Sequence, residues 1–307
     1  MKRAVVILNK GSGGAASLHE LGDRVGDAVR ERGFEPHVRM VEPAELTAAL
    51  GQVHGDSTGL LVIGGGDGSI RCAAARAMEL GLPLAVLPLG TMNLVAKDFG
   101  VPLTGGEAAD ALASGKIAEI DVGEVNGRLF LHSAVLGIVP SMGAERERSR
   151  GHKGIGAGIE LVRRMWGVIQ RERPLHAMLE FGGERHNVKT FMIAISANRL
   201  RAMGPSALLR DSLEAGELGV YWATHQTRAG LLQLLGGLGT GLWGLDERVA
   251  RHAAREVLVR ARRRRLLVSI DGEPELLPLP LRFRVRAGAL RVLVPTRVAE
   301  ETASADA

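Results

Sequence analysis

The chain has 307 residues, of which 46% are hydrophobic and 3% aromatic, with a formal net charge of +5. This length supports one large domain or two ordinary ones, and the basic balance suits an anionic partner such as a nucleotide or a membrane surface. The few aromatic residues argue against a surface that stacks nucleic-acid bases, so we expect no nucleic-acid partner. The single cysteine, Cys72, excludes an internal disulfide and a cysteine-based zinc site, and we expect its thiol to be packed in the core.

The first third of the chain alternates short apolar runs with amphipathic stretches that end at glycine. The predicted strands cover 3–9, 35–41, 59–63 and 83–87, and the predicted helices cover 16–32, 43–50, 69–80 and a stretch after residue 93. Strands that alternate with helices at these lengths predict a parallel sheet with helices on both faces.

The pattern changes near Ile117, where most of the runs become strand-like. The predicted strands cover 117–125, 128–138, 174–181, 187–197, 217–223, 255–260, 264–270 and 281–286, with helical patches at 155–171 and 227–239. A strand-rich part that follows an α/β part indicates two domains with a boundary near residue 122.

No run of apolar residues is long enough to span a membrane, which takes about 18 or more. The nearest, 229–245, contains several glycines, and we expect it to pack on the second domain rather than to anchor the chain. The start, "MKRAVVILNK", has too few apolar residues for a signal peptide, so we expect a cytoplasmic protein.

Three loops rich in small residues follow consecutive predicted strands: "NKGSGG" at 9–14, "GGGDG" at 64–68 and "GTMN" at 90–93. In an open α/β sheet, ligands bind at the carboxyl ends of the strands, where glycines let backbone N–H groups approach phosphates. These loops therefore predict a nucleotide site, although tight turns alone would give the same composition.

One carboxylate, Asp67, lies inside the second of these loops. An aspartate beside phosphates repels them unless a divalent cation such as Mg²⁺ is part of the ligand. The loops match neither the G-x-x-x-x-G-K-[ST] pattern nor G-x-G-x-x-G after the first strand. The pattern therefore favours phosphoryl transfer over dinucleotide redox chemistry.

A second pair of carboxylates, Asp271 and Glu273, is separated by one glycine at the end of a predicted strand. Such a pair is typical of a catalytic site. An ordinary hairpin turn explains it equally well, because Asp-Gly is a favoured turn dipeptide.

Taken together, these elements resemble the bacterial diacylglycerol kinase and lipid kinase family, which is related to sphingosine and ceramide kinases. The resemblance covers nearly the whole chain and rests on four ordered elements: "ILNKGSGG", "GGGDGSI", "LPLGTMNLVAKDFGVP" and "SIDGEPELLPLPLRFRVRAGALRVLVP". It implies an α/β nucleotide-binding domain like that of NAD kinases and phosphofructokinases, over 1–122 with about 288–300 returning to it. It also implies a C-terminal all-β, sandwich-like domain for the lipid substrate, over 123–287.

The resemblance assigns a role to each motif residue. Glu273 would be the general base, Asp67 a catalytic residue and metal ligand, and Asp271 a support for Glu273 or a further Mg²⁺ ligand. The residues implied to hold ATP are Asn9, Lys10, Gly11, Ser12, Gly13, Gly64, Gly65, Gly66, Asp67, Gly68, Ser69, Gly90, Thr91 and Asn93.

The chain departs from the family pattern at a few positions. Lys10 replaces a usual proline, Gly14 stands where a basic residue often occurs, and Leu94 stands where many members have aspartate. In "SLEAGELGVYW", Glu214 and Ala215 replace two acids, which puts a structural Mg²⁺ ion there in doubt.

The function expected from the resemblance is an ATP-dependent, Mg²⁺-dependent lipid kinase acting on diacylglycerol or a related lipid alcohol. Its partner would be a membrane lipid met at the inner membrane face, and a homodimer is left open. Two alternatives also stay open: a kinase of a soluble alcohol, and a catalytically silent regulator that binds lipid or nucleotide.

Overall fold

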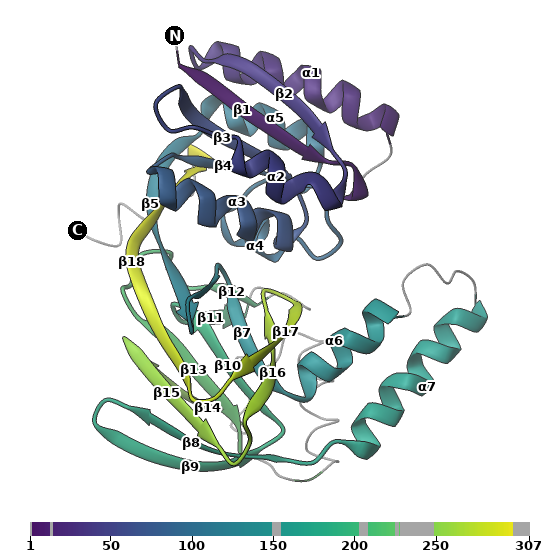
Figure 1. Ribbon diagram of the computed structural model, residues 1–307, viewed down its shortest axis with the longest axis vertical. Coiled ribbons are helices and arrows are strands. Elements are labelled where there is room, and N and C mark those ends of the chain that lie inside the picture. The colour runs from purple at the N-terminus through teal and green to yellow at the C-terminus, as the bar shows by residue number, and fades with distance from the viewer. Residues whose placement is uncertain are drawn as a thin grey trace. The chain divides into compact units, whose positions relative to one another are not determined.

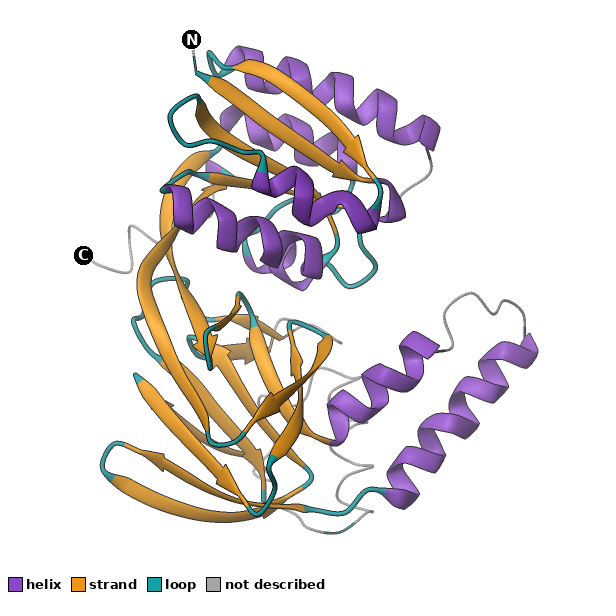
Figure 2. Ribbon diagram, viewed as in Figure 1, coloured by secondary structure: helices purple, strands orange, loops and turns teal. Residues whose placement is uncertain are grey.

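The structure is a computed structural model that describes residues 2–12, 15–148, 155–202, 208–224, 227 and 249–296. The chain divides into two compact units, each with its own core. The first unit comprises Met1–Val122, Ser212–Glu214 and Ala287–Ala307, and the second comprises Gly123–Asp211 and Ala215–Arg286. Figure 2 shows helices around the strands of the first unit and a second unit built mainly of strands.

The first unit is built on a parallel sheet whose strands follow the order β2-β1-β3-β4-β18. Its strands are β1 (Arg3–Asn9), β2 (Glu35–Val41), β3 (Thr58–Gly65), β4 (Leu84–Pro88) and the last residues of β18 (Leu281–Val294). All five residues of β4 are buried, and so is β1 from Ala4 onward. Such continuous apolar runs are what a strand covered on both faces requires.

Helices cover both faces of this sheet (Figure 1). Helix α1 packs against α5, and α3 packs against α2 and α4. The helical elements are η1 (Lys10–Ser12), α1 (Ala15–Glu31), η2 (Pro43–Glu45), α2 (Leu46–Gly51), α3 (Asp67–Leu80), α4 (Leu94–Asp98) and α5 (Gly105–Ser114). The predicted α/β class of the first domain is confirmed.

Helix α3 differs from its prediction in two respects. It begins at Asp67 rather than at residue 69, so this aspartate lies in the first helical turn. Its buried face is made by residues spaced three and four apart, among them Ile70, Ala73 and Ala77. Cys72 falls on the opposite face and is exposed, so the expectation of a core thiol is wrong.

The second unit contains two sheets that pack face to face. One has the order β14-β13-β10-β7-β16-β17, and the other runs through β18, β15, β8 and β9, with β5 and β6 joined to β18. A hydrophobic core that includes Leu179, Ile195, Val259 and Phe283 lies between them. The predicted sandwich-like class of the second domain is therefore confirmed.

The strands of this unit are mostly short, and β5 reaches it from the first unit. Their bounds are β5 (Lys116–Val125), β6 (Arg128–Phe130), β7 (Ser133–Gly137), β8 (Leu175–Phe181), β9 (Glu184–Thr190), β10 (Met192–Ala197), β11 (Leu200–Ala202), β12 (Leu208–Arg210), β13 (Leu218–Ala223), β14 (Val249–Ala254), β15 (Glu256–Ala261), β16 (Arg265–Ile270) and β17 (Glu273–Pro278). Two helices, α6 (Ile138–Arg148) and α7 (Ile155–Arg171), follow β7 (Figure 1).

Several strand limits in this unit differ from those predicted from the sequence. The predicted strand 128–138 is two strands separated by Leu131 and His132, and α6 begins where it was expected to end. The predicted helix over 155–171 is confirmed as α7. The stretch 229–245 and the helix expected over 227–239, apart from residue 227, lie outside the described residues.

No helix within the described ranges combines the length and the apolar character needed to cross a bilayer.

Candidate functional site

Asn9, the last residue of β1, connects the first glycine-rich loop to the second. Its side chain is buried, its Nδ2 donates to Ser69 Oγ at 3.0 Å, and its Oδ1 accepts the Gly11 N–H at 3.0 Å. Ser69 belongs to the first turn of α3, so one amide side chain fixes both loops at the carboxyl edge of the sheet. Asn9, Gly11 and Ser69 are therefore brought together.

Asp67 connects the second loop to the third. Its Oδ1 accepts the backbone N–H of Val95, in the first turn of α4, at 3.0 Å. Its Oδ2 has no hydrogen bond to any residue in the described part of the chain. One oxygen therefore positions the side chain, and the other remains available for a ligand.

The second and third loops also touch through their backbones. The Leu89 N–H donates to Gly65 O at 3.1 Å. A Cβ placed on Gly90 would lie 2.6 Å from Gly66 Cα, and one on Gly65 would lie 2.6 Å from Ser69 Cβ. Glycine is thus required here because the chain segments leave no room for side chains.

Two further glycines of these loops are closely packed, Gly64 against β1 and Gly11 against η2. A Cβ on Gly64 would lie 2.6 Å from Leu8 Cδ2, and one on Gly11 would lie 2.5 Å from Pro43 Cγ. The carboxyl edge of this sheet therefore presents mainly backbone atoms, together with the start of the 14-residue helix α3.

Asn93 closes the third loop on itself. Its Oδ1 accepts the Gly90 N–H and its Nδ2 donates to Gly90 O, both at 2.9 Å. Its φ of 49° is left-handed, a conformation that asparagine tolerates better than most residues. The predicted residue Thr91 is exposed on this loop, beside Met92, whose side chain is 46% exposed.

The remaining predicted residues of the first loop are less well defined. The Lys10 ammonium pairs with Glu42 Oε1 at 3.2 Å, and both side chains are largely exposed, so the pair adds little stability. Ser12 lies in η1. Gly13 lies outside the described residues, and so does Gly14, the position that differs from the family pattern.

Gly90→Ala is expected to destabilise the first unit by about 1–3 kcal/mol, because the new Cβ would overlap backbone that cannot rotate away. Gly51→Ala is the matched control. Nothing lies within 4 Å of a Cβ at that position, and its φ is not left-handed. That change is expected to stabilise by up to about 1 kcal/mol. Urea unfolding of the two variants would measure the change in unfolding free energy of each, which should have opposite signs. Equal changes would contradict the packing argument.

In the second unit, Asp271 and Gly272 form the turn between β16 and β17. Their φ values are 47° and 90°, which is typical of a two-residue hairpin turn. The hairpin expected as the alternative reading of this motif is therefore present. It does not account for the Asp271 side chain, which is buried and points back into the unit.

The Asp271 carboxylate accepts three backbone N–H groups, two from the link between β6 and β7 and one from the first residue of β7. Oδ2 accepts from Leu131 at 2.8 Å, and Oδ1 accepts from His132 at 2.9 Å and from Ser133 at 3.0 Å. The Asp271 N–H in turn donates to Ser133 O at 2.9 Å. These bonds clamp the turn onto the neighbouring chain.

Burial raises the pKa of Asp271 above its usual range, because a carboxylate loses its hydration there. The three backbone N–H groups and the nearby His132 act in the opposite direction.

Glu273, the first residue of β17, is exposed and stands directly after this clamped turn. The backbone of the turn also lies near α6, where a Cβ on Gly143 would be 3.8 Å from Gly272 O. No three His, Cys, Asp or Glu side chains within the described ranges are grouped so that they could hold a metal ion.

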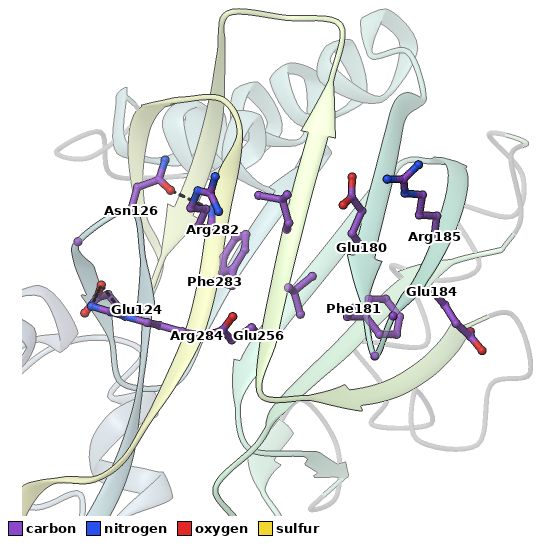
Figure 3. Close-up of a pocket in the computed structure, with 15 residues that line it drawn as sticks. Glu124, Asn126, Glu180, Phe181, Glu184, Arg185, Glu256, Arg282, Phe283 and Arg284 are labelled. Carbon is purple, nitrogen blue, oxygen red and sulfur yellow. Dashed lines mark hydrogen bonds and ion pairs between the residues drawn. The ribbon is translucent and has the colours of Figure 1, made fainter.

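A hollow of about 790 Å³ in the second unit contains none of the predicted site residues. Figure 3 shows charged side chains along its lining, among them Arg284, whose Nη2 pairs with Glu124 Oε1 at 2.7 Å, together with the ring of Phe283. Asn126 Oδ1 accepts the Arg282 N–H at its rim at 2.9 Å. Charged walls do not suit acyl chains, so the lipid cleft expected in this domain stays a prediction.

Two family models match the chain in the order of its units. The diacylglycerol kinase catalytic domain matches residues 3–125, and the YegS C-terminal NAD kinase beta sandwich-like domain matches residues 165–294. A relative from Pseudomonas savastanoi pv. phaseolicola, named "Probable lipid kinase YegS-like", is 32% identical over 96% of this chain and 94% of its own length. The chain belongs to this bacterial lipid kinase family. A relative of the same name from Pseudomonas aeruginosa is 34% identical over 87% of each chain.

A solved structure of a diacylglycerol kinase from Bacillus anthracis agrees with the family assignment at the level of the fold. Its TM-score is 0.71 over 97% of this chain and 98% of that one, at 16% identity. The lipid kinase fold is therefore retained at low sequence similarity.

The hydrogen-bond donors that hold Asp67 and Asp271 could not be predicted from the sequence. The Val95 N–H that binds Asp67 and the three N–H groups that bind Asp271 are main-chain donors. Backbone groups leave no signal in residue types. Only the break in the strand pattern around His132 would have hinted at the second set.

Proposed function

We propose that this member of the family transfers the γ-phosphate of ATP to the hydroxyl of diacylglycerol or a related lipid alcohol. The product would be phosphatidic acid or an analogous lipid phosphate. The observation that carries the proposal is the joining of the three glycine-rich loops at one sheet edge, with one oxygen of Asp67 left available there. Membership in the lipid kinase family supports the same reaction class.

The glycine edge fits the phosphates of a nucleotide. Side chains are sterically excluded at Gly65 and Gly90, so a polyanion can approach the main chain closely. The start of α3 adds the positive end of a helix dipole, which favours negative charge. Asn9 would hold the first two loops together while the phosphates bind, and Asn93 would keep the third loop closed.

The residues present also fit a divalent cation that is held in part by the nucleotide. Mg²⁺ is often bound by one or two carboxylates together with phosphate oxygens and water, rather than by a full protein cage. Asp67 offers one oxygen for this purpose, in agreement with the absence of a three-residue ligand group from the described ranges. Such a cation would neutralise charge on the transferring phosphoryl group.

We assign different roles to the two acids of the second unit. Glu273 is exposed and would take the proton of the lipid hydroxyl as the general base. Asp271 would act as a positioning residue, because three backbone N–H groups already engage its carboxylate. Its predicted role as a Mg²⁺ ligand would need a further lone pair on these oxygens.

A diacylglycerol does not leave the bilayer, so the proposal includes peripheral contact with the inner membrane face from the cytoplasm. The net charge of +5 is compatible with an anionic lipid surface.

The direct test is incubation of the purified chain with γ-labelled ATP and Mg²⁺, in parallel with vesicles that each contain one neutral lipid alcohol and with soluble alcohols. Label in a lipid phosphate, identified by mass spectrometry, is expected. Label found only in soluble acceptors such as NAD or a sugar would replace the proposal with a soluble-alcohol kinase. ATP binding without transfer to any acceptor would favour the silent regulator.

A further inference from the structure

The first unit has a hollow of about 260 Å³ at the amino-terminal edge of its sheet. Its lining comes from the starts of three parallel strands: Lys2 before β1, Thr58–Leu60 in β3, and Gly81–Pro83 before β4. The neighbouring strand β18 adds Arg291 and Leu293. Since parallel strands begin at one edge and end at the other, this amino-edge hollow lies across the sheet from the glycine loops.

Three cations line the amino-edge hollow, and no carboxylate does. Lys2 and Arg291 are exposed, whereas Arg32 is half-buried. An unbalanced group of cations around a concave surface attracts an anion, because the surrounding protein limits the screening by water.

Arg32 is held in place before any ligand arrives. Its Nη1 donates to the carbonyls of Leu112, Ala113 and Gly115, at 3.2, 3.0 and 2.8 Å, where α5 ends. Its Nε and Nη2 have no hydrogen-bond partner in the described part of the chain. A fixed guanidinium with unused donors loses little entropy when it binds an oxyanion.

The rest of the amino-edge hollow is apolar. Leu60, Leu82 and Leu293 are buried along it, and the Phe34 ring lies so near Gly59 that a Cβ there would be 2.5 Å from it. Ile117 lines it with a side chain that is 45% exposed, a large apolar group left partly in water. A ligand with a short apolar body would cover this surface.

We propose that the amino-edge hollow is a second binding site, one that takes a small amphipathic oxyanion. The ligand has a carboxylate or phosphate head, which meets Lys2, Arg32 and Arg291, and an apolar body of a few carbons, which covers Ile117. The volume admits roughly nine water-sized groups, since one water occupies about 30 Å³. That size fits a short acyl chain with its head and is too small for a nucleotide.

The test measures binding of hexyl phosphate and of hexanoate to the full chain by calorimetry, with hexanol and inorganic phosphate as half-ligands. Both amphipathic anions are expected to bind, and each half-ligand is expected to bind at least about tenfold more weakly, because it meets only one part of the site. Stronger binding of one anion identifies the head as phosphate or carboxylate. Inorganic phosphate that binds as well as hexyl phosphate would overturn the proposal, and so would failure of both anions to bind.

Ile117→Glu and Ile117→Gln form a matched pair of variants that tests whether the anion binds beside Ile117. The two new side chains have nearly the same size, but only glutamate brings a negative charge among the three cations. Ile117→Glu is expected to weaken anion binding about tenfold relative to Ile117→Gln. Equal affinity of the two variants would place the anion elsewhere and contradict the proposal.

A second pair of variants covers the case in which the glutamate variant fails to fold. The double change Lys2→Gln and Arg291→Gln removes two exposed cations from the amino-edge hollow, and Arg185→Gln removes an exposed one from the second unit. Only the double variant is expected to lose affinity, by about tenfold, and binding that withstands it would again refute the site.

Discussion

Asp67→Asn is expected to lower the rate of phosphoryl transfer at least about a hundredfold while the first unit stays folded. The asparagine Oδ1 can still accept the Val95 N–H, which Asp67 Oδ1 accepts at 3.0 Å, so the link between the second and third loops survives. The change replaces the available oxygen by an amide nitrogen, which cannot bind a cation. Labelled-ATP transfer to lipid vesicles, measured across a Mg²⁺ titration, gives the loss.

The control for this variant is Asp56→Asn, which changes an exposed aspartate of the same unit and should leave the rate unchanged. Asp67→Ala adds a second comparison, because it removes the bond to Val95 as well and should also lower stability by about 1 kcal/mol. A fully active Asp67→Asn variant would remove Asp67 from the metal site. A variant that unfolds would show that the role of its charge is structural.

Glu273→Gln is expected to reduce the transfer rate about 10²–10⁴-fold, the usual contribution of a general base. Its stability should change by less than about 0.5 kcal/mol, because the side chain is exposed. ATP affinity should be retained, since the proposed nucleotide residues lie in the first unit. Single-turnover transfer and nucleotide binding, measured separately, distinguish loss of the base from loss of ATP binding.

Two further variants show whether the effect belongs to Glu273 alone. Glu275→Gln alters the next acid on β17, which pairs with Arg128 at 3.6 Å, and should keep nearly full activity. Asp271→Asn should cost about 1–3 kcal/mol of stability, because an amide cannot accept from all three N–H groups, although asparagine tolerates the left-handed φ. Equal activity of the Glu273 and Glu275 variants would rule out Glu273 as the base.

The first unit could be predicted well because its signals are local. Continuous apolar runs such as the one in β1 and glycines at helix ends such as Gly81 mark strand and helix limits directly. The placement of the three loops at one edge of the sheet then follows from the parallel topology. The exposed Cys72 was predicted incorrectly because its helix buries only one face. Alanine occurs on both the buried and the exposed face of this helix, so the residue types do not show which face is which.

The second unit was harder to predict because its pairings join distant residues. β17 was missed because two prolines and two glutamates hide its alternation, and β14 was missed because "VARHAA" contains only one apolar side chain larger than alanine. The clamp on Asp271 joins positions about 140 apart in sequence through main-chain donors. Its presence could not be read from the residue types, whereas the acids themselves could.

Strand β18 has a consequence for how the chain is made. It pairs with β15 through its first residues and with β4 through Val292, so the first unit obtains the strand beside β4 only from the end of the chain. β4 is wholly buried in the folded protein. During synthesis it remains an unpaired, apolar edge strand until the entire second unit has emerged from the ribosome. Residues 1–122 expressed alone would keep that edge permanently and should aggregate, so the two units are best treated as a single unit of biosynthesis.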